Sequence, residues 1–286
     1  MAFFNNTRDE DVTGDYPQLR KFNAEDNQKF EKLKIWLTQN TTKERAHDII
    51  SFLKTWQPAV NAHLADKLIN SAVSDTRLAL RNNAVSRLPG IDLTNKNVLR
   101  YRYSSGIDKG KWTIHLDKPS GPVLASTVIP QSQGWNIGRV DFSGVEGVHD
   151  LYFTYTNPGV EKTNEGTLAT FDWFYFTSSF PGSAAPGYDS AYTWFNDLMG
   201  TSVPVVTPIM MENPSDMFRP THVFERGNWM VKGAEVQPDV PASLNPMPEG
   251  APRNRLGLAM WLTDKKNPLT SRTIVNRIWE QLMGQG

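Results

Sequence analysis

Three short segments in the middle of the chain place an apolar or aromatic residue at every second position. They span residues 111–117, 147–153 and 171–176. A period of two turns one side of an extended strand toward a core, so each segment predicts a strand with a buried face. Turns rich in Gly, Pro, Ser and Asn separate them, which is typical of an antiparallel β-sandwich. Strands of this kind need a second layer to cover them.

The flanks of this region predict helices and extended segments. Residues 1–58 end in a helical hairpin. Asn23 or Asp26 is a suitable N-cap for its first helix, and Thr42 for its second. Residues 59–180 are expected to form the sandwich. Residues 181–286 open with a linker, continue as a proline-rich arm and end in two amphipathic helices. The expected fold class is mixed and mainly β, with a central antiparallel β-sandwich of the jelly-roll kind flanked by α-helical segments.

Composition excludes several partners and cofactors. Lys plus Arg number 30, as do Asp plus Glu, so the chain has no basic field to attract nucleic acid. No run approaches the roughly 18 apolar residues of a membrane span, and the N-terminus lacks the pattern of a signal peptide. We therefore expect no membrane insertion. The absence of cysteine excludes thiolate nucleophiles and the Cys-x-x-Cys-His haem attachment site.

Four motifs in the central region resemble the second half of a family 6 carbohydrate-binding module. They are residues 114–122, the pair 129–130 with Gly134-Trp135, residues 147–153 and residues 171–174, in the order and spacing of that family. The resemblance implies a jelly-roll β-sandwich that binds a polysaccharide or another glycan without catalysis.

Both ends of the chain are similar to uncharacterised domains of large secreted proteins of planctomycetes and related bacteria. Residues 253–262 and 267–279 resemble the opening of a domain of unknown function, and residues 1–9 resemble the tail of the domain that precedes it. A c-type cytochrome domain lies further upstream in those proteins. The resemblance implies a slice of a larger exported protein, periplasmic or at the cell surface. Its remaining domains would be partners of this chain, and haem would lie only in a missing upstream domain.

The candidate sugar site centres on Trp135, which stands in a polar loop. An exposed indole offers a flat apolar platform for a pyranose ring, while nearby amides bind the hydroxyl groups. The resemblance implies that Trp135 stacks on sugar, with Gln133, Asn136 and Thr170 as further binding residues. The alternative is that Trp135 closes the end of the core.

Two departures from the resembled family bear on this site. Residues 81–84, predicted as a loop, carry no aromatic residue where the family has its second platform. Thr170 stands where the family has asparagine. Losing one stacking face weakens sugar binding by about 1 kcal/mol. A structural or interaction scaffold with a degenerate sugar site is therefore the alternative function.

Asp172 is the candidate metal ligand. The resemblance implies a structural calcium ion built on this carboxylate and on acidic residues of the first strand. Residues 60–63 contain no glutamate, and the imidazole of His63 is a poor ligand for a hard cation. We therefore expect Asp172 to act as a hydrogen-bonding residue and the chain to hold no cofactor, with calcium as the alternative.

No catalytic residue is identified. His149 and Asp150 are neighbours on a predicted strand and point to opposite faces, so they do not form a catalytic pair. The chain is expected to be non-catalytic. The second alternative is a fragment of an enzyme whose catalytic residues lie in the flanking domains.

The apolar faces at the two ends of the chain need cover. We expect the N-terminal hairpin and the two closing helices to pack into one helical layer, from which the sandwich emerges between Pro58 and Pro181. The alternative is two separate ends, each without its partner sequence.

Overall fold

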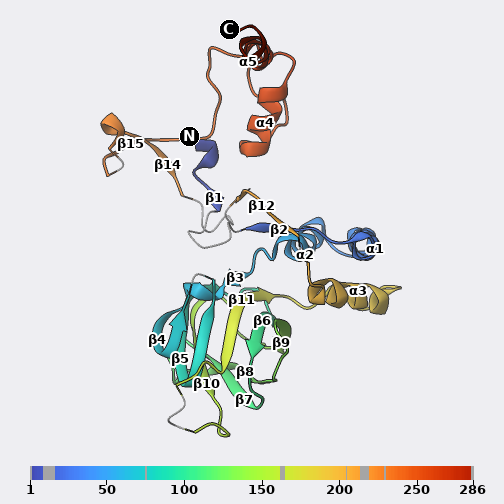
Figure 1. Ribbon diagram of the computed structural model, residues 1–286, viewed down its shortest axis with the longest axis vertical. Coiled ribbons are helices and arrows are strands. Elements are labelled where there is room, and N and C mark those ends of the chain that lie inside the picture. Colours follow the sequence, from blue (N-terminus) through green and yellow to red (C-terminus); the bar gives the residue numbers. More distant parts are fainter. Residues whose placement is uncertain are drawn as a thin grey trace. The chain divides into compact units, whose positions relative to one another are not determined.

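The computed structural model describes residues 2–8, 17–74, 76–161, 165–203, 205–212, 219–228 and 230–284. The chain divides into two compact units (Figure 1). The larger is Glu10–Ile209, and the smaller joins Met1–Asp9 to Met210–Gly286. The helical hairpin and the sandwich share the larger unit. The assignment of the end segments to neighbouring domains of a parent protein stays a prediction.

In the described part of the larger unit, nine strands form one antiparallel sheet that folds over on itself. The strands are β3 (Val60–Asn61), β4 (Asp66–Val73), β5 (Leu78–Asp92), β6 (Val98–Ser105), β7 (Gly110–Leu116), β8 (Val123–Ile129), β9 (Asn136–Asp141), β10 (Val148–Thr156) and β11 (Ala169–Thr177). Their order is β8-β7-β10-β5-β11-β6-β9, with β3 added to β11 and β4 added to β5. The long β5 pairs with both β10 and β11, and so joins the two halves. The expected antiparallel β-sandwich with flanking helices is confirmed.

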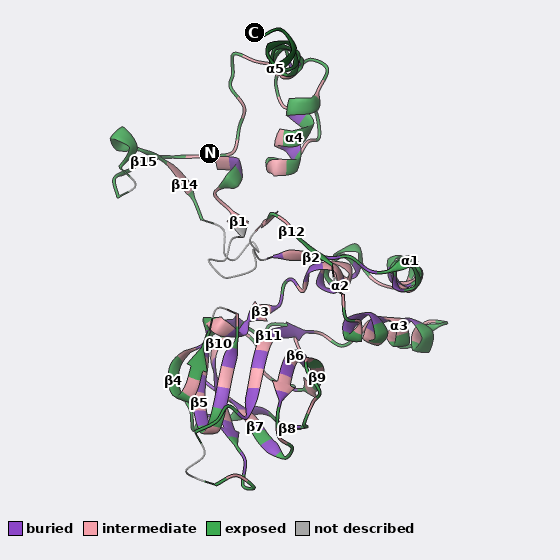
Figure 2. Cartoon of the chain, viewed as in Figure 1, coloured by how far each residue is buried: buried purple, intermediate pink, exposed green. Residues whose placement is uncertain are grey.

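An aromatic core fills the space between the two halves of the sheet. The predicted alternation in residues 111–117 is confirmed, because Trp112, Ile114 and Leu116 are all buried. Figure 2 shows buried positions along the strands of this sheet. The Trp112 ring centroid lies 4.7 Å from that of Phe171 and 4.8 Å from that of Tyr101. Such close, tilted ring pairs add to the stabilisation from burial alone.

A β-bulge in β11 changes the predicted facing of this strand. The register shifts between Phe171 and Trp173, so that Asp172 is an extra residue. Phe171 and Phe174 therefore belong to the core between the sheet halves, while Trp173 faces the helices. The expectation that Phe171 and Trp173 share one buried face was wrong, because one inserted residue reverses the alternation.

Residues 81–84, predicted as a loop, lie inside β5. Asn83 has a φ of 56°, a left-handed conformation that bends the strand where it passes from one half of the sheet to the other. The side chain of Asn82 accepts a hydrogen bond from the Asn157 N–H at 2.8 Å and donates one to the Asn157 carbonyl at 3.1 Å. These bonds hold the bent part of the strand against Asn157, so residues 81–84 continue β5 and do not form a loop.

A second core lies on the outer face of β11, beneath α1 (Ala24–Asn40), α2 (Lys43–Thr55) and α3 (Tyr188–Gly200). Asn23 and Thr42 are the N-caps of α1 and α2, since each accepts a backbone N–H with its side-chain oxygen, while Asp26, the other candidate for α1, lies in its first turn. The Phe52 ring stacks on Tyr175 with centroids 3.9 Å apart. This contact fixes the hairpin to the sheet.

Helix α3 covers the apolar face of the hairpin, and the expected packing of the closing helices on the hairpin stays a prediction. Phe195 and Leu198 of α3 are buried together with Leu33 and Leu37 of α1. Phe180, the last residue of the expected sandwich, stacks on Trp36 with centroids 5.8 Å apart. The segment predicted as a linker also packs here, because Trp36 Nε1 donates a hydrogen bond to the Pro186 carbonyl at 2.8 Å. The short strands β2 (Gln18–Arg20) and β12 (Val206–Pro208) pair beside these helices.

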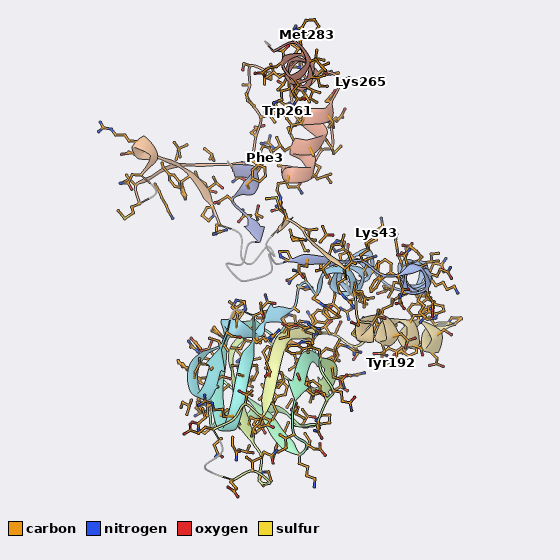
Figure 3. The ribbon with its side chains drawn as sticks, in the orientation of Figure 1. Phe3, Lys43, Tyr192, Trp261, Lys265 and Met283 are labelled. Atoms are coloured by element: carbon orange, nitrogen blue, oxygen red, sulfur yellow. The ribbon has the colours of Figure 1, made fainter. Side chains whose placement is uncertain are left out.

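The smaller unit holds the two closing helices. Its described elements are η1 (Ala2–Phe4), β1 (Thr7–Arg8), β13 (Met211–Glu212), β14 (Thr221–Phe224), η4 (Glu225–Gly227), β15 (Lys232–Val236), α4 (Arg255–Thr263) and α5 (Thr270–Met283). Trp261 of α4 is buried and donates a hydrogen bond to the Asn245 carbonyl at 2.6 Å (Figure 3). Helix α5 begins at Thr270, and Leu269 occupies its N-cap position. Among the described residues, every helix is too short or too polar to cross a membrane.

His149 and Asp150 take different partners at the edge of the sandwich. His149 Nδ1 lies 3.0 Å from Asp117 Oδ2, and Asp150 accepts a hydrogen bond from Arg87 Nη1 at 2.7 Å. The hydrogen bond to Asp117 raises the pKa of His149 above its ordinary value of 6.5, while partial burial opposes the rise. The pair therefore stabilises the fold fully below pH 6.5, and this stabilisation is lost as the pH rises through the folded-state pKa.

Replacing Asp117 by asparagine is expected to lower the pKa of His149, because the carboxylate that favours imidazolium is gone. The measurement is an NMR titration of the histidine ring protons. Asp141→Asn is the control, since Asp141 pairs with Arg139. An unchanged His149 titration in Asp117→Asn would show that another group holds the proton.

Candidate functional site

The loop between β8 and β9 positions Trp135. The Ser132 hydroxyl accepts a hydrogen bond from the Ser105 N–H at 2.9 Å and donates one to the Gly134 carbonyl at 2.8 Å. Gly134 has a φ of 89°, which residues with a Cβ rarely adopt. These bonds tie the loop to the end of β6. The Trp135 ring is therefore held, half-buried, at the start of β9.

A pocket of about 500 Å³ opens beside this indole. Trp135, Gln133 and Asn136 line it together, and both amide residues are exposed. The other lining residues are Trp56, Arg100, Arg102, Ile137, Asn196, Met199, Gly200, Thr201 and Ser202. Thr170 lies elsewhere on β11, opposite Ser104 of β6, and is not part of this lining. Three of the four predicted sugar-binding residues thus come together, and their role in binding stays a prediction.

A second pocket of about 230 Å³ adjoins the first. The two share Trp56, Arg102, Thr201 and Ser202 as walls. The residues that complete the second pocket are Gln18, Arg20, Thr55, Gln57, Asn61, Thr76, Asp172, Trp173, Val203 and Val206. We call the two pockets together the groove. It runs between the sandwich and the ends of α2 and α3.

Trp56 gives the groove a second aromatic wall, which the sequence did not assign to a site. It is the C-cap of α2, with a left-handed φ of 59°, and it is half-buried. The guanidinium carbon of Arg20 lies 3.7 Å from the centroid of its ring. The signal in the sequence was a tryptophan at the point where the helix must end before Pro58. The sequence alone does not show that this point meets the loop of Trp135.

Arg102 and Asp172 form an ion pair in the groove, where Asp172 lines the smaller pocket and Arg102 lines both pockets. Arg102 Nη1 donates to Asp172 Oδ2, and the Arg102 guanidinium carbon lies 4.9 Å from the Trp135 ring centroid. Burial raises the pKa of Asp172, while the charge of Arg102 opposes this rise. The extra residue of the β11 bulge thus faces a cation.

The part of the chain that the structure describes has no cluster of three or more His, Cys, Asp or Glu fit for a metal ion. That Asp172 binds no calcium remains a prediction.

Two buried arginines surround this pair. Arg20 donates to the carbonyls of Leu53 at 2.7 Å, Leu198 at 3.1 Å and Thr201 at 2.9 Å, so it holds the C-terminal ends of α2 and α3 beside each other. Burial and the neighbouring charge of Arg102 lower the pKa of Arg20 to about 9, and the guanidinium is still charged at neutral pH. Sequence reasoning missed Arg20 because residues 1–20 show no strand pattern.

Arg100 is the second buried cation. It is only 6% exposed, and its guanidinium carbon lies 4.9 Å from the Phe195 ring centroid. Burial lowers the pKa of Arg100, an effect that the Tyr192 hydroxyl opposes. The same hydroxyl accepts a hydrogen bond from Arg139 at 2.7 Å, so Tyr192 joins α3 to the facing strands β6 and β9 (Figure 3).

Two polar atoms in the smaller pocket's walls have no hydrogen-bond partner among the described residues. They are Gln57 Oε1 and Trp173 Nε1, both buried. Buried polar groups normally pair with protein, water or ligand.

Comparison with known proteins gives partial likenesses. The model of a family described as a protein of unknown function (DUF1553) matches residues 254–286. This agrees with the resemblance at the C-terminal end, while the planctomycete-type context stays a prediction. None of the curated proteins matches the chain.

Several solved structures are similar to parts of the chain. A family 6 carbohydrate-binding module from Clostridium cellulolyticum, in complex with xylose, is 18% identical, with 42% of this chain and 96% of that chain covered and a TM-score of 0.37. A β-1,3-glucan-binding module of the same family from Bacillus halodurans is 17% identical, with 42% and 95% covered and a TM-score of 0.36. A family 43 arabinoxylan arabinofuranohydrolase from Bacillus subtilis, in complex with cellotetraose, is 23% identical with a TM-score of 0.32. That match covers 36% of this chain and 21% of the hydrolase.

Proposed function

We propose that the Glu10–Ile209 unit binds a polysaccharide or another glycan in the groove, without catalysis. The observation that carries this proposal is the half-buried Trp135 beside the exposed amides of Gln133 and Asn136 in one pocket of about 500 Å³. Small-molecule sites typically have volumes of about 300–1,000 Å³. An indole face covers the C–H groups of a sugar ring, and the amides bind its hydroxyl groups.

The opposite wall of the groove supports the same proposal. Asn196 comes from α3, and Thr201 and Ser202 follow its C-terminus, so an amide and two hydroxyl groups line the pocket from the helical side. Trp56 adds a second aromatic surface at the junction of the two pockets. A sugar in the groove would meet the Trp135 ring and hydrogen-bonding groups together, which is the combination that a pyranose ring requires.

We further propose that the chain belongs to a larger exported bacterial protein. The motifs at both ends support this proposal, and the family match of residues 254–286 supports its C-terminal part.

A scaffold with a degenerate sugar site is the second candidate, and the surroundings of Trp135 favour it. The guanidinium carbons of Arg77 and Arg102 lie 5.2 Å and 4.9 Å from the centroid of this ring. Cation–π contacts of this kind are worth about 0.5–1 kcal/mol at exposed sites. A sugar that stacks on Trp135 has to share the ring with them or displace one.

Replacing Trp135 by alanine is expected to weaken glycan binding by at least about tenfold, because the stacking platform is lost. The thermal midpoint should change little, since the residue is half-exposed in a loop. The measurement is a glycan array followed by titration calorimetry with the best ligand. Trp279→Ala is the matched control, because Trp279 is 54% exposed on α5.

The two candidate functions give different results. Binding that survives Trp135→Ala unchanged would move the site away from this loop. No retention of any glycan by the wild-type chain, together with normal folding, would favour the scaffold.

A further inference from the structure

The groove carries an excess of positive charge. Among the described residues that line its two pockets, the ionisable side chains are Arg20, Arg100, Arg102 and Asp172. Three cations therefore face one carboxylate. The whole chain has equal numbers of acidic and basic residues, so this excess is local and does not follow from composition.

Two of the cations are fixed parts of the fold. Arg20 is 3% exposed, donates to three backbone carbonyls and makes no ion pair with a carboxylate in the described part of the chain. Arg100 is 6% exposed and contacts an aromatic ring. A charge that is buried without a carboxylate acts strongly on its surroundings, because little water screens it. Both guanidinium groups therefore make the groove attractive to anions.

Arg102 is the cation that a ligand can reach. Its side chain is 30% exposed and lines both pockets. Its Nη1 donates to Asp172, whose side chain is 13% exposed. A guanidinium carries five N–H donors in a planar fork, and such a fork suits an oxyanion. The same guanidinium lies beside the Trp135 ring, where the proposed sugar would stack.

We infer that the groove selects an anionic glycan, whose carboxylate or sulfate group pairs with Arg102 while the sugar ring lies against Trp135. This inference rests on the proposed glycan binding and adds the class of ligand to it. The arginine that partly covers Trp135 then has a role, since it recognises the acidic group of the sugar that the indole holds. The exposed Arg77, 5.2 Å from the same ring, lies where a second acidic group of a polymer would meet it.

The test compares matched acidic and neutral glycans on the full chain. The probes are oligogalacturonate with its methyl ester, and carrageenan oligosaccharide with its desulfated form. Titration calorimetry at low and high salt gives the affinity for each. At low salt, at least one acidic probe is expected to bind about tenfold or more tightly than its neutral match, and salt should reduce this ratio. Preference for the uronate or for the sulfate identifies the anionic group.

The variant that tests the role of Arg102 is Arg102→Gln combined with Asp172→Asn. Both residues are changed because Arg102→Gln alone would leave the buried Asp172 carboxylate without its cation, and an unpaired buried charge destabilises the fold. The acidic-to-neutral ratio is expected to fall to within about twofold of unity. Arg139→Gln with Asp141→Asn is the matched control, because this ion pair lines neither pocket of the groove. In this control the acidic-to-neutral affinity ratio is expected to equal that of the wild type.

The outcomes separate this inference from the proposed function. Equal binding of acidic and neutral probes, lost in Trp135→Ala, would overturn the anionic preference and leave glycan binding standing. An acidic preference that persists in the Arg102→Gln, Asp172→Asn variant would overturn the assignment to Arg102. Retention of none of the four probes by a folded wild-type chain would refute both the inference and the function on which it rests.

Discussion

Replacing Trp112 by alanine is expected to lower the free energy of unfolding of the Glu10–Ile209 unit by about 3–5 kcal/mol. The side chain is fully buried between the two halves of the sheet, with Phe153, Phe171 and Phe174 around it. Removing the indole leaves a cavity that these rings cannot close without moving. For a unit of this size the thermal midpoint should fall by roughly 10 °C. Urea unfolding and a thermal melt measure the change.

Two companion variants make this result specific. Trp112→Phe is expected to lower the free energy of unfolding much less than the alanine variant does. Phenylalanine keeps a ring in the core, and the Trp112 Nε1 that it removes is buried without a hydrogen-bond partner among the described residues, so no hydrogen bond is lost. Trp279→Ala should stay within about 0.5 kcal/mol of the wild type, since Trp279 is largely exposed. A loss below about 1 kcal/mol in Trp112→Ala would mean that this core is not what holds the sandwich together.

Replacing Phe52 by alanine is expected to lower the free energy of unfolding of the same unit by about 3 kcal/mol or more. Phe52 is fully buried, stacks on Tyr175 and contacts the Trp173 ring edge-on at 5.4 Å. It thus joins α2 to the sheet. Urea unfolding, together with hydrogen exchange of the α2 amides, measures the loss. Ile35→Ala on α1 is the matched control, because Ile35 is 58% exposed.

The same variant connects stability to the groove. The Phe52 ring lies 5.2 Å from that of Trp56, and Trp56 is a wall of both pockets. When α2 loosens, Trp56 no longer has a fixed position, so glycan affinity should fall together with the exchange protection of α2. Full affinity in Phe52→Ala, with α2 unprotected, would show that the helical wall takes no part in binding.

The sequence by itself determined most of the local structure. Alternation identified β7 and the second half of β10, whereas Val148, before the β10 bulge, is exposed and not buried as the pattern predicted. Asn23 and Thr42 were among the caps that marked where α1 and α2 begin, because capping is decided by a few adjacent residues. The polar loop around Trp135 was also identified from its neighbours alone. Gln133 and Asn136 follow from the same short stretch.

Only the tertiary structure decided what surrounds that loop. The bulge at Asp172 turns Trp173 toward the helices, and a single inserted residue leaves no trace in a pattern that is apolar on both sides. Arg20, Trp56 and Arg102 come from three separate elements and line one pocket because the hairpin packs on β11. Such a meeting depends on the sum of many weak contacts between distant segments, which no local pattern records. The charge and the second aromatic wall of the groove were therefore set by packing.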